Sequence, residues 1–82
     1  MRNTIKVKLD SIENAQKFVD ICNQFENIDI DYIVGRYIVD AKSIMGVLST
    51  SLGRVVSVKL NKVDQKIMDL FCSLIRDWII GE

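Results

Sequence analysis

The sequence predicts an α+β fold, an open-faced sandwich in which helices cover one face of a four-stranded antiparallel sheet. Four segments alternate apolar and polar residues, which is typical of strands with one buried face. Two long segments repeat apolar residues at helical spacing. With a short helix before the last strand, the elements follow one another in the order βαββαβα. Because each long helix must bury its apolar stripe, packing on one face of the sheet is the simplest arrangement.

The chain begins with a predicted strand and a predicted helix. Residues 4–9 alternate apolar residues with lysines, so they form the first strand. Asp10 and Ser11 are both good N-caps, and they introduce a helix over residues 12–25. The apolar stripe of this helix consists of Ala15, Phe18, Val19, Cys22 and Phe25.

A hairpin and a short helix are predicted next. Residues 28–34 and 37–41 alternate again on either side of Gly35, which marks a tight turn between two strands. Ser43 can cap a short helix over residues 44–48, and the serines, threonine and glycine that follow end it.

The C-terminal part predicts the last strand and the last helix. Residues 56–60 alternate with apolar residues at 56, 58 and 60. Asp64 then opens a helix that we expect to continue to about Gly81. Its apolar stripe consists of Ile67, Leu70, Phe71, Leu74, Trp78 and Ile79.

Length and composition indicate one folded domain over residues 1–82. Apolar residues make up 49% of the chain and proline is absent, whereas disordered chains are poor in apolar side chains. Eleven basic and eleven acidic residues cancel, so no net field draws the chain to nucleic acid or to an acidic membrane. Four lysines in or beside the strands are interpreted as a solvated face: Lys6, Lys8, Lys59 and Lys62.

The N-terminus and the cysteines predict the compartment. The chain enters its first strand without the apolar segment of a signal peptide, and no apolar run reaches the length of a membrane span. We therefore expect a cytoplasmic protein with no membrane partner. In a reducing compartment, Cys22 and Cys72 are expected to be free thiols that pack in the core rather than a disulfide.

The residue types exclude most catalytic chemistry. The sequence contains no histidine, so the common metal ligand and the common base for a serine or cysteine nucleophile are missing. The four glycines stand singly and form no phosphate-binding loop. Asp29 and Asp31 are interpreted as the wet face of a strand rather than as a catalytic pair. We expect no enzyme activity, no metal site and no cofactor.

The run KSIMGVLS, at residues 42–49, is the most informative part of the sequence. Ser43 is followed at once by two large apolar residues on a helix too short to bury both of its sides. Some apolar surface of this helix is therefore expected to remain exposed, and an exposed apolar cluster usually marks a contact surface.

The segment AKSIMGVLS, residues 41–49, resembles the segment of HPr that carries the regulatory serine of that family. HPr is the histidine-containing phosphocarrier of the phosphoenolpyruvate:sugar phosphotransferase system. The order βαββαβα also matches the HPr fold over essentially the whole chain, with Phe25 on the aromatic that ends the family's first helix. The resemblance implies an HPr-like open-faced β-sandwich, and it makes Ser43 the candidate regulatory phosphorylation site.

In the same register, the family's active-site signature, histidine-alanine-arginine-proline-alanine, falls on SIENA at residues 11–15. Ser11 takes the acceptor position, and only the final alanine agrees. Glu13 replaces the arginine that resembles a phosphate-pairing group, so it repels an incoming anion. Because a serine phosphate ester is far less labile than phosphohistidine, Ser11 is interpreted as a helix cap at a degenerate acceptor position. The chain is therefore predicted to be unable to carry phosphohistidine.

The resemblance implies a non-catalytic, regulatory or vestigial HPr-like protein that binds protein partners through residues 43–48. In an HPr-like arrangement only the side of Val47 faces the core, and the exposed contact surface consists of Ile44, Met45 and Leu48. Those partners would be components of the phosphotransferase system, an HPr kinase or a transcriptional repressor, and phosphorylation of Ser43 would switch between them. The catabolite-repression homologues of HPr likewise lack the acceptor histidine and keep the regulatory serine. We expect no nucleic-acid partner, and either a monomer or a weak homodimer.

Two other classes of function stay open. A small protein- or RNA-interaction module on a ferredoxin-like α+β fold would need aromatic residues on its sheet and a basic rim, and Tyr32 and Tyr37 are the only aromatics of the predicted strands. An enzyme would have to complete its site with residues from a dimer partner. A gel shift at low salt distinguishes the RNA module from a partner-binding protein.

Overall fold

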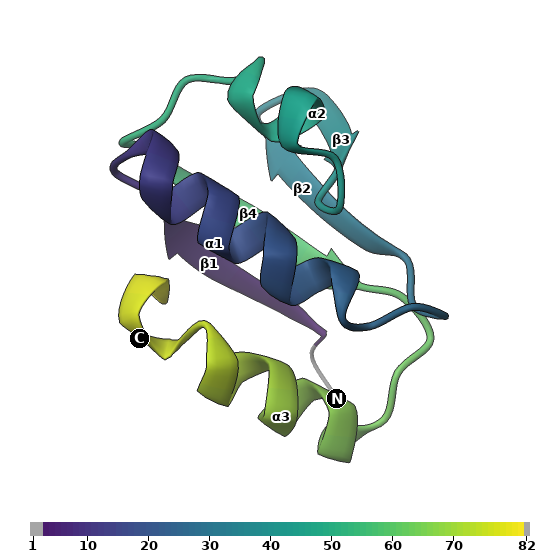
Figure 1. Ribbon diagram of the computed structural model, residues 1–82. Helices are drawn as coiled ribbons and strands as arrows, with labels where there is room; N and C mark the ends of the chain where they lie inside the picture. The colour runs from purple at the N-terminus through teal and green to yellow at the C-terminus, as the bar shows by residue number, and fades with distance from the viewer. Residues whose placement is uncertain (1–2, 82) are drawn as a thin grey trace.

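The computed structural model describes residues 3–81, and its elements follow the predicted order (Figure 1). The elements are β1 (Thr4–Lys8), α1 (Ile12–Asn23), β2 (Ile30–Val34), β3 (Tyr37–Asp40), α2 (Ile44–Leu48), β4 (Val55–Leu60), α3 (Gln65–Leu74) and the 3-10 helix η1 (Arg76–Trp78). Most predicted boundaries lie within two residues of these.

The four strands form one antiparallel sheet in the order β1-β4-β2-β3. β4 lies between β1 and β2, while β3 pairs only with β2, as the second strand of the predicted hairpin. The turn between β2 and β3 consists of Gly35 and Arg36, and Gly35 has a φ of 60°, which glycine adopts without strain. The predicted α+β open-faced sandwich is confirmed.

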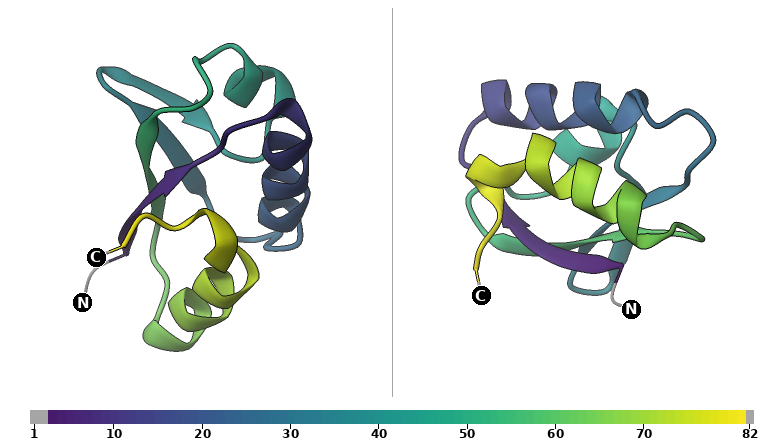
Figure 2. Two further views of the ribbon diagram at one scale, coloured as in Figure 1. Left: turned by 90° about the vertical axis from the view of Figure 1, so that its left-hand side faces the viewer. Right: turned by 90° about the horizontal axis from the view of Figure 1, so that it is seen from below.

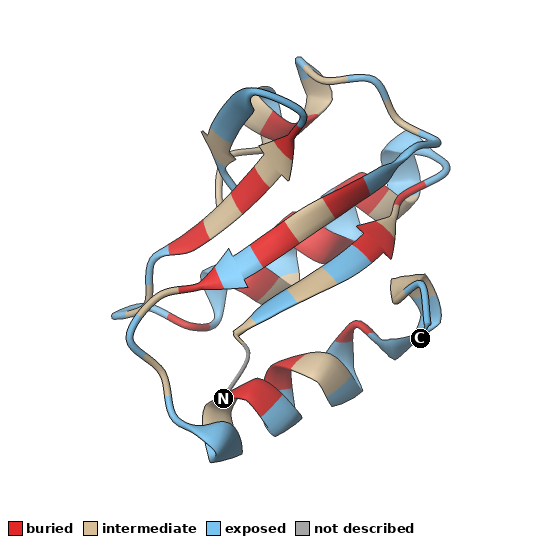
Figure 3. Ribbon diagram, turned by 180° about the vertical axis from the view of Figure 1, so that it is seen from behind, coloured by how far each residue is buried: buried red, intermediate tan, exposed pale blue. Residues whose placement is uncertain are grey.

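The helices lie on one face of the sheet (Figure 2). Buried side chains from the helices and the strands form the hydrophobic core. Seen from behind, no helix crosses the sheet, and buried and accessible residues alternate along β2 and β4 (Figure 3). Phe18 of α1 is at the centre of the core. Its ring centroid lies 5.8 Å from that of Tyr32, 6.4 Å from that of Phe71 and 6.3 Å from that of Trp78. Phe18 and Phe71 therefore face each other in one aromatic cluster, as predicted. The rest of the predicted stripe of the last helix is wrong in part, because Leu70 and Leu74 are exposed while Met68 and Ile75 are buried beside Phe71.

The C-terminal segment differs from the sequence prediction. α3 ends at Leu74 instead of continuing toward Gly81, and a single 3-10 turn follows. Ile79 then forms an isolated antiparallel bridge with Val7, and the N–H of Ile80 donates to the carbonyl of Lys6 at 2.9 Å. The final apolar residues thus pair with the outer edge of β1, because there they satisfy strand backbone groups that a continued helix would leave to solvent.

Candidate functional site

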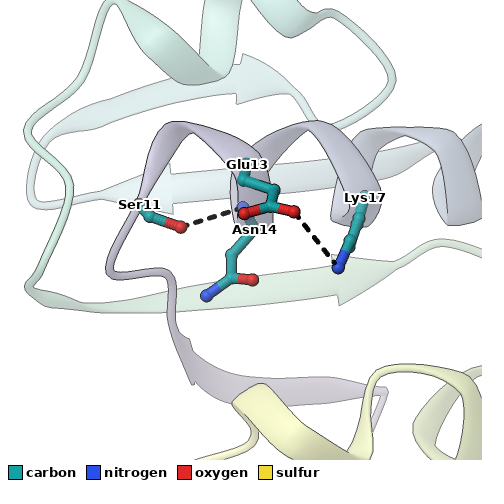
Figure 4. A network of polar contacts seen from close by, with 4 residues as sticks. All are labelled: Ser11, Glu13, Asn14 and Lys17. Carbon is teal, nitrogen blue, oxygen red and sulfur yellow. Dashed lines mark hydrogen bonds and ion pairs between the residues drawn. The ribbon is translucent and has the colours of Figure 1, made fainter.

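The N-terminal end of α1 is where the HPr resemblance puts a phosphoryl acceptor. Ser11 is the N-cap of this helix, and its Oγ accepts a hydrogen bond from the N–H of Asn14 at 3.0 Å (Figure 4). The side chain is exposed and has the extended backbone of an ordinary cap. The geometry agrees with the interpretation of Ser11 as a helix cap.

Two opposite charges lie next to Ser11 on the first turns of α1. The Glu13 carboxylate is 3.7 Å from the Lys17 ammonium, and both side chains are exposed (Figure 4). A surface pair of this kind contributes little to stability. The negative charge of Glu13 also cancels the positive charge with which Lys17 could attract an anion. α1 contains no arginine, so the helix lacks the planar fork that binds phosphate in a bidentate way.

The start of α2 has the same local hydrogen bond in a different setting. The Oγ of Ser43 accepts from the N–H of Gly46 at 3.0 Å, and Ser43 is only half-exposed. A Cβ at position 46 would lie 3.3 Å from this Oγ and 3.4 Å from the Cβ of Val39. A glycine at position 46 therefore keeps the space beside the Ser43 hydroxyl free.

The segment before α2 is tied to the C-terminal end of α1. The Lys42 ammonium donates to the carbonyls of Phe25 at 2.6 Å and of Glu26 at 3.4 Å. The Asn23 side-chain amide donates to the carbonyl of Lys42 at 3.0 Å. These bonds fix the position of the residue immediately before Ser43, because they tie Lys42 to the last turn of α1 and to the turn that follows it.

Ser11 and Ser43 therefore lie at opposite ends of α1. Ser11 starts the helix, whereas Ser43 lies beside its last turn, and twelve residues of helix extend for about 18 Å. The α2–β4 loop approaches the other end, where the N–H of Gly53 donates to the carbonyl of Leu9 at 2.7 Å. The two serines do not form one site.

The apolar residues of α2 are less exposed than the sequence predicts. Val47 is buried as expected, and Met45 is 77% exposed. Ile44 and Leu48 are only partly exposed, because they pack against the rim of the core, so the prediction that all three point outward holds for Met45 alone. Ile12, which directly follows the α1 cap, is 63% exposed. Its place in the first turn, outside the apolar stripe of α1, was the sequence signal for this exposure.

Both cysteines are free thiols, as expected. Cys22 is fully buried on α1, whereas Cys72 is half-exposed on α3. Burial raises the pKa of the Cys22 thiol to about 12; Lys42 lowers it and Asp40 raises it, both to a smaller extent. Burial also raises the pKa of Cys72, with a further contribution from Asp69. Neither thiol is held in the thiolate form that a nucleophile needs.

Three surface hollows of about 330, 720 and 490 Å³ lie elsewhere, and neither Ser11 nor Ser43 lines any of them. Asp29 and Asp31, interpreted as a plain wet face, line the third of these hollows with Asp40 and Asn61. Among residues 3–81, no group of three or more metal-ligating side chains comes together. No helix in the described part of the chain is long and apolar enough to span a membrane.

The positions of the two tyrosines bear on the RNA-module alternative. Tyr32 is buried in the core. Tyr37 pairs with the buried Val34, so it lies on the side of the sheet that faces the helices, although its ring is exposed at the end of the strand. The open face therefore has no aromatic platform among the described strand residues, and an RNA-binding sheet would need one.

The fold belongs to the class of small α+β open-faced sandwiches with a four-stranded antiparallel sheet. Solved structures with this fold include the phosphocarrier protein HPr from Bacillus anthracis and HPr-C-His from Thermoanaerobacter tengcongensis. The chain has therefore an HPr-like fold.

Sequence identity to these structures is low although the overlap is nearly complete. The Bacillus anthracis protein superposes with a TM-score of 0.64 at 23% identity, over 87% of this chain and 93% of its own. The Thermoanaerobacter tengcongensis protein superposes with a TM-score of 0.68 at 29% identity, over 90% of this chain and 89% of its own. No family model matches the sequence, and no curated protein matches it.

Proposed function

We propose that this chain is a phosphocarrier-related protein that does not carry a phosphoryl group and acts instead as a regulatory, partner-binding form of HPr. The observation that carries the proposal is an HPr-like fold built from a sequence without histidine. A phosphocarrier of this kind stores the group on an imidazole, and no residue of this chain offers one.

The start of α1 supports the first half of the proposal. The Ser11 hydroxyl already accepts a hydrogen bond from the backbone N–H of Asn14, and Glu13 adds a negative charge two residues away. An arriving phosphoryl group would find an alcohol in place of an imidazole, beside a carboxylate that repels it. These features favour a structural cap over an acceptor.

The start of α2 supports the second half. Ser43 is a partly accessible hydroxyl beside a glycine, and Met45 presents its side chain to solvent two residues further on. Adding two negative charges at Ser43 would penalise an apolar partner on Met45 and favour one that bears arginine. Ile44 and Leu48 would take part through their exposed portions.

The decisive experiment is incubation of the full chain with an HPr kinase and ATP, followed by localisation of phosphate by mass spectrometry. We expect one phosphate on Ser43, none after Ser43→Ala, and unchanged labelling after Ser11→Ala. In parallel, enzyme I and phosphoenolpyruvate should leave no acid-labile phosphate on the chain. Acid-labile labelling would contradict the loss of carrier function, and absence of kinase labelling would contradict the regulatory role.

Met45 is tested by partner capture. Ser43→Asp and Met45→Lys should each change the set of retained phosphotransferase components or repressors relative to the unmodified chain, while the melting temperature stays within that of surface variants. The matched control is Ser11→Asp, which places the same charge at the other helix cap. Equal partner profiles for Ser43→Asp and Ser11→Asp would contradict the assignment of the contact surface to α2.

A further inference from the structure

The edge strand β3 has backbone groups that no described part of the chain covers. In an antiparallel pair, alternate residues direct their N–H and C=O toward the neighbouring strand. The N–H of Ala41 donates to the carbonyl of Ile30 in β2 at 2.9 Å. By alternation, the backbone groups of Val39 also point toward β2. The backbone groups of Ile38 and Asp40 therefore point away from β2, toward the free edge. The carbonyl of Asp40 accepts the N–H of Ser43 at 3.0 Å. Both backbone groups of Ile38 therefore remain at the free edge.

The side chains in the middle of this strand do not protect the edge. Exposed edge strands are usually shielded by charged residues, above all lysine, by proline or by a bulge. β3 includes neither lysine nor proline, and its one charged residue, Asp40, stands at its end. Tyr37 is 73% exposed and Ile38 is 64% exposed, which places them among the most accessible large apolar residues of the described chain. An edge of this kind is a template for another strand.

The charges at the two ends of β3 fit a second copy of the same strand. Arg36 precedes the strand and Asp40 ends it, with Ile38 midway between them. Within residues 3–81, neither Arg36 nor Asp40 belongs to an ion pair. In an antiparallel pairing centred on Ile38, Arg36 of each copy lies opposite Asp40 of the other. A parallel pairing would not produce this match.

Hollows on both sides of β3 leave room for the opposing side chains. The charged residues that line the hollow of about 490 Å³ are Asp29, Asp31, Asp40 and Lys42, so three carboxylates outweigh one ammonium where the other copy's Arg36 would approach. The hollow of about 330 Å³ is lined by Tyr37 and Val39, and the other copy's Tyr37 would lie opposite Val39 beside it. Charge and space are thus both complementary under a two-fold rotation.

We propose that two copies of this chain pair antiparallel through β3, about a two-fold axis at Ile38, and join their sheets into one. The N–H and C=O of Ile38 then bond to those of the second Ile38. Two ion pairs between Arg36 and Asp40 flank this central pair. Because a four-residue strand buries a small area, the association is weak, with a Kd on the order of 100 µM.

The test is sedimentation equilibrium of the full chain between about 10 µM and about 1 mM, combined with amide exchange of Ile38 followed by NMR. We expect the weight-average mass to rise toward that of a dimer, and the Ile38 amide to exchange about fourfold more slowly at the higher concentration, because a Kd on the order of 100 µM leaves about a fifth of the chain monomeric there. A monomer over the whole range would overturn the proposal. An amide of Ile38 that exchanges equally fast in monomer and dimer would also overturn it.

Two sets of variants locate the interface. Ile38→Pro removes the outward N–H without removing a bond to β2, so it should abolish association while the circular dichroism spectrum is kept. Arg36→Asp and Asp40→Arg should each associate at least about tenfold more weakly than the unmodified chain, and their equimolar mixture should recover association as a heterodimer.

The control is Leu70→Lys, at an exposed apolar position on α3. This variant should associate like the unmodified chain. Loss of association in Leu70→Lys, or its persistence in folded Ile38→Pro, would place the contact on another face and overturn the assignment to β3. Failure of these tests leaves the proposed function untouched, because that function depends on Ser43 and Met45.

Discussion

Ser11 and Ser43 begin their helices with the same hydrogen bond, yet they stand in two different environments. Each Oγ accepts a backbone N–H three residues later at 3.0 Å. Ser11 heads a helix of twelve residues and has a charged pair beside it, whereas Ser43 heads a helix of five residues held by bonds from Lys42. The cap geometry is therefore common to both and cannot by itself distinguish a structural serine from a modifiable one.

The difference lies in what supports each helix start. α1 is anchored along its length by buried residues that include Phe18 and Cys22, so its start needs little support from elsewhere. α2 buries Val47 alone, and its position depends on neighbours at the end of α1. A short helix held from outside can have an exposed surface altered without disturbing the core, which is what a regulatory surface requires.

The largest expected effect is loss of the anchor of α1. Phe18→Ala should lower the free energy of unfolding by about 3–5 kcal/mol, because Phe18 is fully buried against three other aromatic rings. Chemical denaturation measures this change in the free energy of unfolding. The control is Tyr37→Ala, which truncates an exposed aromatic residue. A shift no larger than that of the control would show that α1 is not anchored through this residue.

A smaller effect is expected at the support of α2. Lys42→Met keeps the length of the side chain but removes the donor to Phe25, so it should cost about 1–2 kcal/mol. The control is Lys66→Met on exposed α3, which should stay within about 0.5 kcal/mol of the unmodified chain. Equal stabilities of the two variants would mean that α2 does not depend on Lys42.

The two caps should contribute nearly equally to the stability of the fold. Ser11→Ala and Ser43→Ala should each cost about 1 kcal/mol, whereas the corresponding glycine variants should cost only a few tenths. Thermal melts of the four variants measure this. If one alanine variant were neutral, its serine would not act as a cap in solution.

The smallest effect at neutral pH concerns Cys22, which lies where α1 meets the segment before α2. Its pKa is raised from 9.0 to about 12, so folding favours the protonated thiol. The contribution of this protonated thiol to the free energy of unfolding is fully present below about pH 9, and it is lost as the pH rises from about 9 toward about 12. Denaturation midpoints of the unmodified chain and Cys22→Ala, measured at pH 7 and pH 10, check this. The unmodified chain should lose more stability than the variant.

Most of the fold could be predicted because its signals are local. Alternation identified the four strands, and Ser11, Ser43 and Asp64 all cap helices in the structure as the sequence suggests. The end of α3 could not be predicted this way, because Trp78 and Ile79 continue the helical spacing while Ile79 pairs with Val7, more than seventy positions earlier. A long-range backbone pairing leaves no local trace.

The candidate site was predictable only in part for a related reason. The position of Ser43 follows from cap preference, but the burial of Ile44 and Leu48 depends on how closely α2 lies against α1 and β3. The separation of Ser11 from Ser43 also depends on the bonds from Asn23 and Lys42. Neither fact is contained in the spacing of residues along one helix.

The pairing of Ile79 with Val7 has a consequence for assembly size. The C-terminal segment occupies the middle of the outer edge of β1, at Lys6 and Val7, so a foreign strand cannot lie along that edge without displacing it. If both edges were free, head-to-tail addition of copies could continue into a fibre. In the proposed dimer both β3 edges are paired and residues 79 and 80 occupy the β1 edges, so addition of further copies would stop at two chains and eight strands.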